Sequence, residues 1–268
     1  MLSEHEILVF NGIKEEFEPR RDVVAIEKEA NIYINDNFYM TFRYLPSQVK
    51  ELVIGHLLTE GIIDDIKELL EVNLSKNNIY VKLSTSNVLD RLRRLSSIIT
   101  NDDGSVGQEI LKAAQKLKSS RVRFSVKSIF KAIEILNSRA LIFKASGGTH
   151  AAALVNRYNE AIAFSEDVGR HNAVDKVIGE AAIKGFNFSE LLLALTGRLS
   201  SEVVIKAARV GIPILVSISA PTSLGIKIAG ELGLTLIGFV RGYRFNIYTY
   251  PNRVEEWARL YNDSHERC

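Results

Sequence analysis

The second half of the chain alternates short, continuous apolar runs with amphipathic stretches of helical period. The apolar runs are ALIFKA, HAAALV, EAIAFS, ELLLAL, IPILVS and LTLIGF, all between residues 140 and 239. The helical stretches are 125–136, 170–184, 200–210 and 222–232. Strands that are buried on both faces are apolar throughout, so this order predicts a mostly parallel sheet with helices on both faces.

The N-terminal part shows the two-residue alternation of half-buried strands instead. The expected hairpins are 22–43, which turns at 35–37, and 69–83, which turns at 76–78. Between them, 45–63 has helical spacing, with Pro46 suited to a first turn and Gly61 to a C-terminal stop. A further helix is predicted over 86–97.

The stretch 96–110, SSIITNDDGSVGQEI, interrupts every period and reads as a loop between domains. It divides the chain into an N-terminal domain, 1–105, and a C-terminal domain, 106–268. The predicted fold class is α/β, with a three-layer mixed sheet in the C-terminal domain and a smaller α+β N-terminal domain.

Charge and cysteine content narrow the function classes. Lysine and arginine number 34 against 32 acids, a formal net charge of +2, so we expect neither a nucleic acid nor a membrane surface as partner. The single cysteine, Cys268, allows no internal disulfide and no thiolate metal cluster. With no secretory signal in MLSEHEILVF and no apolar run of about 20 residues, the expected location is the cytoplasm.

Polar and glycine-rich segments follow the predicted strands. They are 146–150, 166–172, 196–202, 219–223 and 240–244. Open α/β sheets bind ligands where strands end and helices begin, and glycines with arginine forks suit phosphate groups. The shared edge therefore predicts an anion site, although each segment alone also fits an ordinary turn or helix cap.

The stretch SEDVGRHNAVDKVIG concentrates charge at one strand-to-helix corner. Asp167 is the expected N-cap, and Lys176 with Glu180 has the spacing of an exposed ion pair. Asp175 lies four residues after His171, so its carboxylate could orient the imidazole. A structural cluster of salt bridges at the corner is the alternative to a ligand site.

Several enzyme classes fail on their motifs. A zinc nucleobase deaminase needs H-x-E and P-C-x-x-C, whereas the tripeptide that starts at His150 is His-Ala-Ala and no internal cysteine exists, so no zinc is expected. A Walker-type NTPase needs a G-x-x-x-x-G-K-[S/T] loop, which is absent. The composition allows a Ser-His-Asp hydrolase, but no G-x-S-x-G elbow is present.

At GGTHAAALV, EDVGRHNAVDKVIG, TGRLSSEVVIKAARVGIPILVSISAPTSLGIKIA and LTLIGFVRGYR, the sequence resembles the formate dehydrogenase accessory protein family, FdhD/NarQ. The resemblance extends to VFNG and ELVIGHLLTEGII near the N-terminus. It implies a cytidine-deaminase-like C-terminal domain and a cytoplasmic homodimer. It also implies binding of the molybdenum bis(molybdopterin guanine dinucleotide) cofactor as cargo. Family members pass sulfur from a cysteine desulfurase to this cofactor before it enters formate dehydrogenase.

The family has a cofactor-binding segment near its last strand. The resemblance implies that the corresponding residues here are Phe239, Val240, Arg241, Gly242, Tyr243 and Arg244. The further expected contacts are Gly147, Gly148, His150, Asp167, Arg170, His171, Asn172, Arg198 and Thr222. Because the cargo carries guanine dinucleotides, a guanine nucleotide is expected to mimic it.

The chain departs from the family at the sulfur carrier, which is a cysteine, usually within a C-x-x-C, in the loop that corresponds to 96–105. No cysteine lies there, and Ser or Thr cannot form the persulfide. Three hypotheses remain: a sulfurtransferase that acts through Cys268 or an unrecognised route, a molybdenum-cofactor chaperone without covalent chemistry, and an unrelated nucleotide enzyme with His171 as general base.

Overall fold

The computed structural model describes residues 1–84, 114, 115 and 117–265. The predicted helix over 86–97, the loop over 96–110, the domain boundary at residue 105 and Cys268 lie outside the described residues. Within these ranges, the side chains are described as far as residue 260.

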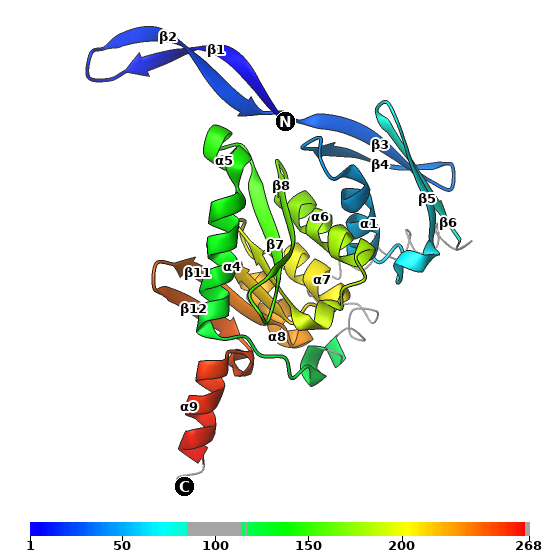
Figure 1. The fold of residues 1–268 in the computed structure, drawn as a ribbon, viewed down its shortest axis with the longest axis vertical. Coiled ribbons are helices and arrows are strands. Elements are labelled where there is room, and N and C mark those ends of the chain that lie inside the picture. Colours follow the sequence, from blue (N-terminus) through cyan, green and yellow to red (C-terminus); the bar gives the residue numbers. More distant parts are fainter. Residues whose placement is uncertain (85–113, 116, 266–268) are drawn as a thin grey trace.

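A mixed six-stranded sheet forms the centre of the C-terminal part (Figure 1), in the order β12-β11-β10-β9-β7-β8. Its strands are β7 (His150–Asn156), β8 (Ala161–Asp167), β9 (Leu191–Leu195), β10 (Ile214–Ser217), β11 (Thr235–Arg241) and β12 (Arg244–Thr249). Only β9, β10 and β11 pair in parallel, while β7 pairs antiparallel with both β8 and β9. The sheet is therefore mixed, and the prediction that it is mostly parallel is wrong, because β7, β8 and β12 pair only antiparallel. The middle of β7 is apolar because helices cover both of its faces.

Helices pack on both faces of this sheet and confirm the three-layer α/β prediction. One face holds α4 (Val126–Arg139), which packs on Ala151, Ala153 and Val155. The other face packs against α6 (Arg170–Ile183), α7 (Ser201–Arg209) and α8 (Ser223–Leu232). A last helix, α9 (Glu255–His265), ends the described chain. The likeness to cytidine deaminases stays a prediction from the resemblance.

The apolar run ALIFKA was predicted as a strand and is instead the short helix α5 (Leu141–Ser146). The Glu166 carboxylate accepts hydrogen bonds from the Ile142 and Phe143 amides at 3.0 and 2.7 Å, which stabilises the helix start. Leu141 and Phe143 stay largely exposed. A short apolar run does not distinguish a strand from a helix, so the long-range contact from Glu166 decides.

The N-terminal part contains the two predicted hairpins and the predicted helix. Its sheet has the order β4-β3-β6-β5, from β3 (Lys28–Ile34), β4 (Asn37–Tyr44), β5 (Leu69–Ser75) and β6 (Asn78–Leu83). Asn35 and Asp36 form the first turn with φ of 46° and 66°, a conformation that Asn and Asp tolerate. Helix α1 (Val49–Thr59) ends before Gly61, whose φ is 72°. The described ranges also contain three single-turn helices: η1 (Ile66–Glu68), η2 (Phe188–Glu190) and η3 (Pro251–Arg253).

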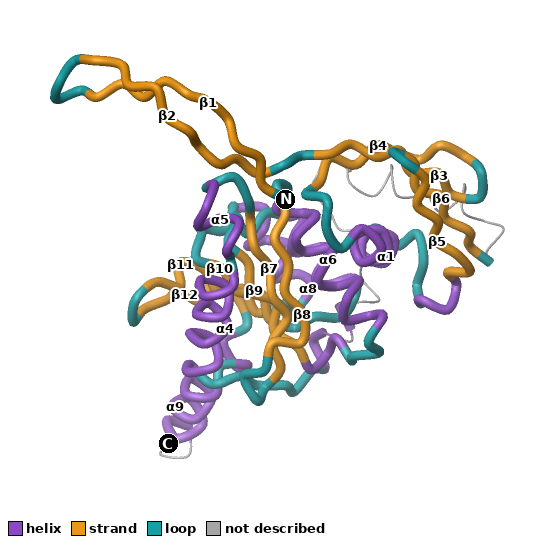
Figure 2. The backbone as a smooth tube through the Cα atoms, turned by 45° about the horizontal axis from the view of Figure 1, so that its top comes forward, coloured by secondary structure: helices purple, strands orange, loops and turns teal. Residues whose placement is uncertain are grey.

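Helix α1 lies between the N-terminal sheet and α6 (Figure 2). At the crossing, a Cβ built on Gly55 would lie 1.7 Å from the Asp175 carbonyl oxygen, and one on Gly179 would lie 1.9 Å from the Glu51 carbonyl oxygen. The two helix backbones are therefore in direct contact, and glycine is required on both sides.

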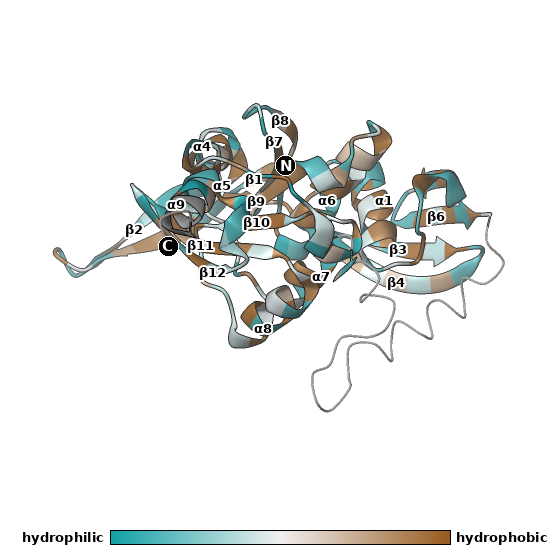
Figure 3. Cartoon of the chain, turned by 90° about the horizontal axis from the view of Figure 1, so that it is seen from below, coloured by the Kyte–Doolittle hydropathy of each residue, from teal (hydrophilic) through white to brown (hydrophobic). Residues whose placement is uncertain are grey.

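A separate hairpin, β1 (Leu2–Asn11) and β2 (Glu16–Ala25), extends away from the rest of the molecule (Figure 1). Phe10 pairs with Phe17 across it, and both rings are mostly exposed. Hydrophobic positions lie along this projection (Figure 3). A two-stranded sheet without cover is marginally stable in water, which favours a partner for this surface.

Candidate functional site at the strand ends of the central sheet

The segment 146–150 lies at the expected edge of the sheet, but it leads into the strand β7 and does not follow a strand as predicted. Because β7 is antiparallel to β8 and β9, its first residue lies level with their last ones: His150 pairs with Asp167, and Ala152 with Leu195. His150 thus starts a strand at the edge where β8, β9, β10 and β11 end.

A set of short hydrogen bonds joins the ends of β7, β9 and β10. Thr196 Oγ1 accepts from the Ala151 amide at 3.0 Å and lies 3.3 Å from His150 Nδ1. Ser219 Oγ donates to the Thr196 carbonyl at 2.8 Å. Thr196 and Ser219 belong to two of the polar segments noted in the sequence, but their side chains were not predicted to take part in the site.

Arg170 lies at the start of α6 beside this edge. Its aliphatic stem packs on Gly197, where a Cβ would lie 3.0 Å from the Arg170 Cβ. Its Nη2 is 4.0 Å from a Glu202 carboxylate oxygen, whereas its buried Nε has no hydrogen-bond partner among the described residues. The buried Oγ of Ser200, the N-cap of α7, likewise lacks a described partner. A buried donor without a partner is costly, so both atoms favour a ligand at this edge.

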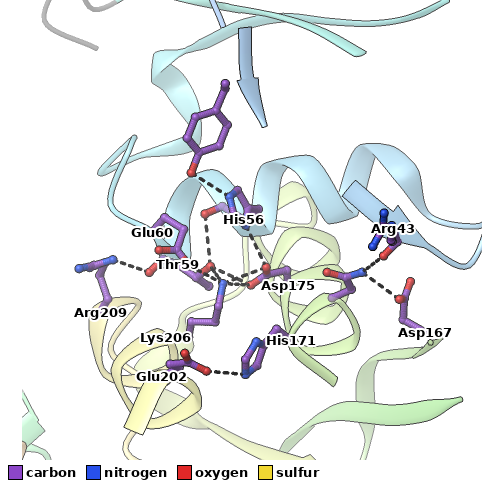
Figure 4. A network of polar contacts seen from close by, with 12 residues as sticks. Arg43, His56, Thr59, Glu60, Asp167, His171, Asp175, Glu202, Lys206 and Arg209 are labelled. Carbon is purple, nitrogen blue, oxygen red and sulfur yellow. Dashed lines mark hydrogen bonds and ion pairs between the residues drawn. The ribbon is translucent and has the colours of Figure 1, made fainter. Parts of the chain in front are cut away.

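The two histidines of the site stay neutral near pH 7. Burial, reinforced by the charge of Arg170, lowers the pKa of His150. Burial also lowers the pKa of His171, with Arg170 adding to the effect and Glu202 opposing it. The His171 Nε2 lies 3.2 Å from a Glu202 carboxylate oxygen (Figure 4). Neutral imidazoles at this edge can donate and accept hydrogen bonds without adding charge.

The predicted segment 239–244 faces a groove on the other side of the sheet. Val240, Arg241 and Gly242 line this groove together with one side of α4, and its volume is about 1420 Å³. Arg241 Nε donates to the Ile218 carbonyl at 2.9 Å, which ties the segment to the end of β10. The β11–β12 turn beyond it exposes Arg244 and the whole Tyr243 side chain. The predicted site residues therefore form two groups, one on each face of the sheet edge.

Of the remaining predicted contacts, Arg198 is exposed next to Gly197, and Thr222 caps α8 through the Gly225 amide at 3.1 Å. Gly147 ends α5 with φ of 68°. Gly148 lies against Ala25, where a Cβ would be 3.3 Å from the alanine methyl.

Asp167 and Asn172 hold the chain between β4 and α1 rather than face the solvent edge. The fully buried Asp167 carboxylate accepts from the Leu45 amide at 3.1 Å and pairs with Lys176 at 2.6 Å. The Asn172 side-chain amide donates to the Arg43 carbonyl at 2.7 Å. Two predictions were wrong as a result: Gly169 is the N-cap of α6, and Lys176 is buried against Asp167.

A buried polar network joins α1, α6 and α7. Lys206 Nζ lies 2.9 Å from both carboxylate oxygens of Asp175 and 2.8 Å from Glu60, while the Thr59 hydroxyl donates to Asp175 at 2.7 Å (Figure 4). His56 Nδ1 lies 3.3 Å from the same carboxylate. The predicted pairing of Asp175 with His171 is therefore wrong, because Asp175 points to the cation of α7.

The charges of this network support each other. Burial opposes ionisation of Asp175, but Lys206 and His56 outweigh it and hold the pKa of Asp175 below its ordinary value. Burial also disfavours charge on Lys206, but Asp175 and Glu60 raise the pKa of Lys206 above its ordinary value. Both groups are nearly inaccessible, so the network serves the fold and not the site.

The family comparison agrees with the motifs around this edge. The model of the FdhD/NarQ family matches residues 25–255. The chain belongs to the FdhD/NarQ family. The match begins at the end of β2 and includes the central sheet, α1 and the strand-end segments, so both groups of predicted site residues lie within the family region.

Individual proteins that match over most of their length also indicate the FdhD/NarQ family. The sulfur carrier protein FdhD of Sulfolobus acidocaldarius is 39% identical over 236 residues, which are 87% of this chain and 92% of the relative. The protein of the same name from Bacillus subtilis is 34% identical over 88% of this chain and 91% of the relative. A crystal structure of a formate dehydrogenase accessory protein from Desulfotalea psychrophila superposes with a TM-score of 0.78 at 27% identity. It covers 94% of this chain and 99% of that one.

No helix in the described ranges is long and apolar enough to cross a membrane. In the same part of the chain, no group of three or more His, Cys, Asp or Glu side chains is arranged to hold a metal ion.

Proposed function

We propose that this protein is a cytoplasmic accessory factor for a formate dehydrogenase, and that it binds the molybdenum bis(molybdopterin guanine dinucleotide) cofactor as cargo. The observation that carries the proposal is the pair of buried polar atoms without described partners, Arg170 Nε and Ser200 Oγ, at the strand-end edge. A pyrophosphate oxygen would satisfy both a guanidinium N–H and a hydroxyl. Family membership supports the same ligand.

The cargo has more than one nucleotide arm, and the site has two faces. Arg170, Ser200 and Thr222 start helices on one face of the sheet, where backbone amides and the helix dipole favour anions. Arg241 lines the groove on the other face. We propose that the two groups of residues bind different parts of one cofactor molecule across the sheet edge.

Transfer of sulfur requires a thiolate that accepts sulfane sulfur from a cysteine desulfurase persulfide and releases the desulfurase thiolate. The only thiol in the sequence is Cys268, and the stretch 96–110 contains none. We therefore propose a binding and delivery role for this chain, with no covalent sulfur step of its own.

The sulfur step has a direct test. After incubation with a cysteine desulfurase and radiolabelled cysteine, wild-type protein separated under non-reducing conditions is expected to retain no label. A desulfurase alone is the control for label input. Label that is retained by the wild type and lost in Cys268→Ala would establish a sulfur carrier and overturn the delivery role.

Guanine nucleotide binding tests the cargo site. Arg170→Ala and the double variant Arg241→Ala/Arg244→Ala are each expected to weaken GDP binding in calorimetry. The expected loss is about 1–3 kcal/mol for each arginine, the scale of a charge-assisted hydrogen bond. The control Arg20→Ala/Arg21→Ala removes as much charge as the double variant, but from the projecting hairpin, where both side chains are exposed. Unchanged affinity in both test variants would remove the cargo from this edge.

We also propose that the protein is a homodimer, as the family resemblance implies. The exposed Leu8, Phe10 and Phe17 on the β1–β2 hairpin support this, since apolar side chains exposed on a two-stranded sheet favour a partner. The molar mass from light scattering is expected to fall to that of one chain in Phe10→Lys/Phe17→Lys. A monomeric wild type at micromolar concentration would contradict the proposal.

A further inference from the structure

A second cleft lies at the end of the sheet opposite the strand-end edge. It has a volume of about 820 Å³ and is formed by residues 118–123, the β7–β8 turn at Arg157, and the junction of η3 with α9. Strand β7 starts at His150 and ends at Asn156, so Arg157 and His150 lie at opposite ends of one strand. The cleft and the candidate cargo site are therefore separate.

The walls of this cleft carry an excess of positive charge. The cations are Lys118, Arg121, Arg123, Arg157 and Arg253, and the one acid in the wall is Glu255. Glu255 is itself paired with Arg259 at 3.3 Å. Within the described part of the chain, no carboxylate forms an ion pair with Lys118, Arg121 or Arg123, and all three side chains are exposed. Arginine forks with no carboxylate partner are suited to bind planar oxyanions bidentately.

Arg253 is the buried member of the wall. It is 1% exposed, and its guanidinium donates to the Gly233 carbonyl at 2.8 Å, to Thr235 Oγ1 at 3.0 Å and to the Leu117 carbonyl. These partners are neutral, and the buried Nε has none among the described residues. Burial lowers the pKa of Arg253, which reflects the cost of this charge without a counter-ion. A bound anion would reduce that cost.

The cleft is held in shape by backbone contacts. The Phe124 amide donates to the Arg253 carbonyl at 2.9 Å, and the Glu255 amide donates to the Phe124 carbonyl at 3.1 Å. The two cation-bearing segments are thus fixed against each other without a ligand. Ser120 and Asn252 add hydroxyl and amide groups to the wall, which complete the donors that a phosphate ester uses.

We propose that this cleft binds a pyrophosphate-type anion. The number of cations exceeds what a single phosphate neutralises, and the volume lies in the range of small-molecule sites. The proposal goes beyond the cargo site, because it concerns the other end of the sheet and requires no guanine.

Calorimetry with inorganic pyrophosphate at fixed ionic strength tests the proposal. The wild type is expected to show saturable binding that Arg121→Ala/Arg123→Ala weakens at least about tenfold, since two charge-assisted contacts are lost. The control Arg20→Ala/Arg21→Ala, with the same change in charge, is expected to stay within about twofold of the wild type. If the test variant does not fold, Arg157→Ala replaces it, because Arg157 is exposed on a turn.

The proposal is overturned by no saturable binding of the wild type up to millimolar pyrophosphate, by an equal loss in the Arg20/Arg21 control, or by equal affinity for orthophosphate. Loss of pyrophosphate binding in Arg241→Ala/Arg244→Ala alone would also overturn it and assign the anion to the groove beside α4. GDP affinity retained in the Arg121/Arg123 variant separates this cleft from the cargo site.

Discussion

A Gly179→Ala variant is expected to be destabilised by about 3 kcal/mol, at the upper end of the cost of overpacking. The new methyl group would lie 1.9 Å from the Glu51 carbonyl oxygen of α1, and backbone cannot move aside as a flexible side chain can. Alanine in a helix is intrinsically better than glycine by about 1 kcal/mol, so the steric effect must exceed this gain. Urea unfolding followed by circular dichroism measures the difference.

Gly230→Ala is the matched control for this prediction. Gly230 also lies within a helix, α8, but a Cβ there would meet only a Thr249 methyl at 3.9 Å. The control is expected to be neutral or more stable by up to about 1 kcal/mol. Gly55→Ala, on the other side of the crossing, is expected to resemble Gly179→Ala. Equal stability of Gly179→Ala and Gly230→Ala would mean that α1 does not pack against α6 at this distance.

A Lys206→Met variant is expected to lose about 3–5 kcal/mol of unfolding free energy, because it leaves Asp175 buried without its main cation. Combination with Asp175→Asn is expected to recover part of this loss, since no uncompensated charge remains. The control Lys131→Met breaks an exposed pair with Glu134 and is expected to cost less than about 1 kcal/mol. A Lys206→Met variant as stable as Lys131→Met would contradict a buried pair.

The pH dependence of stability follows from the same network. Because the folded pKa of Asp175 is lowered, its contribution is complete above its unfolded pKa of about 3.9 and is lost as the pH falls through the folded value. Because the folded pKa of Lys206 is raised, its contribution is complete below about 10.4 and is lost as the pH rises through the folded value. Asp175→Asn is expected to flatten the acid limb of the unfolding free energy, as measured from pH 2 to 7.

Local pattern was sufficient for many elements. The alternation in 22–43 and the Asn-Asp turn identified the β3–β4 hairpin, and the spacing of Ile129, Ala132 and Leu136 identified α4 and its buried side. These features depend on neighbours in sequence, so one sequence contains their cause. The missed helix α5 depends on Glu166, which lies 24 and 23 residues after Ile142 and Phe143 and accepts hydrogen bonds from their amides.

For the site, residue types predicted the edge but not the direction of each side chain. His150, Arg170 and Arg241 lie at the strand ends as expected, yet Arg241 belongs to a groove on the other face from Arg170. Asp167 was assigned as a helix N-cap, and Lys176 and Asp175 were assigned partners four residues away. Each instead contacts a segment more than eight residues away or on another helix.

The corner SEDVGRHNAVDKVIG shows which features the sequence determines and which depend on the tertiary structure. Its residue order alone was enough to indicate the family, the start of a helix and a buried stripe on that helix, because these depend on local chemistry and spacing. Which charges were free to bind a ligand depended on α1 and α7. Their packing buries Lys176 and Asp175 beside partners from elsewhere in the chain. It leaves Arg170 at the edge with an Nε that has no hydrogen-bond partner among the described residues. A contact between two residues that are far apart in the sequence produces no periodic pattern, so such a contact becomes visible only in the tertiary structure.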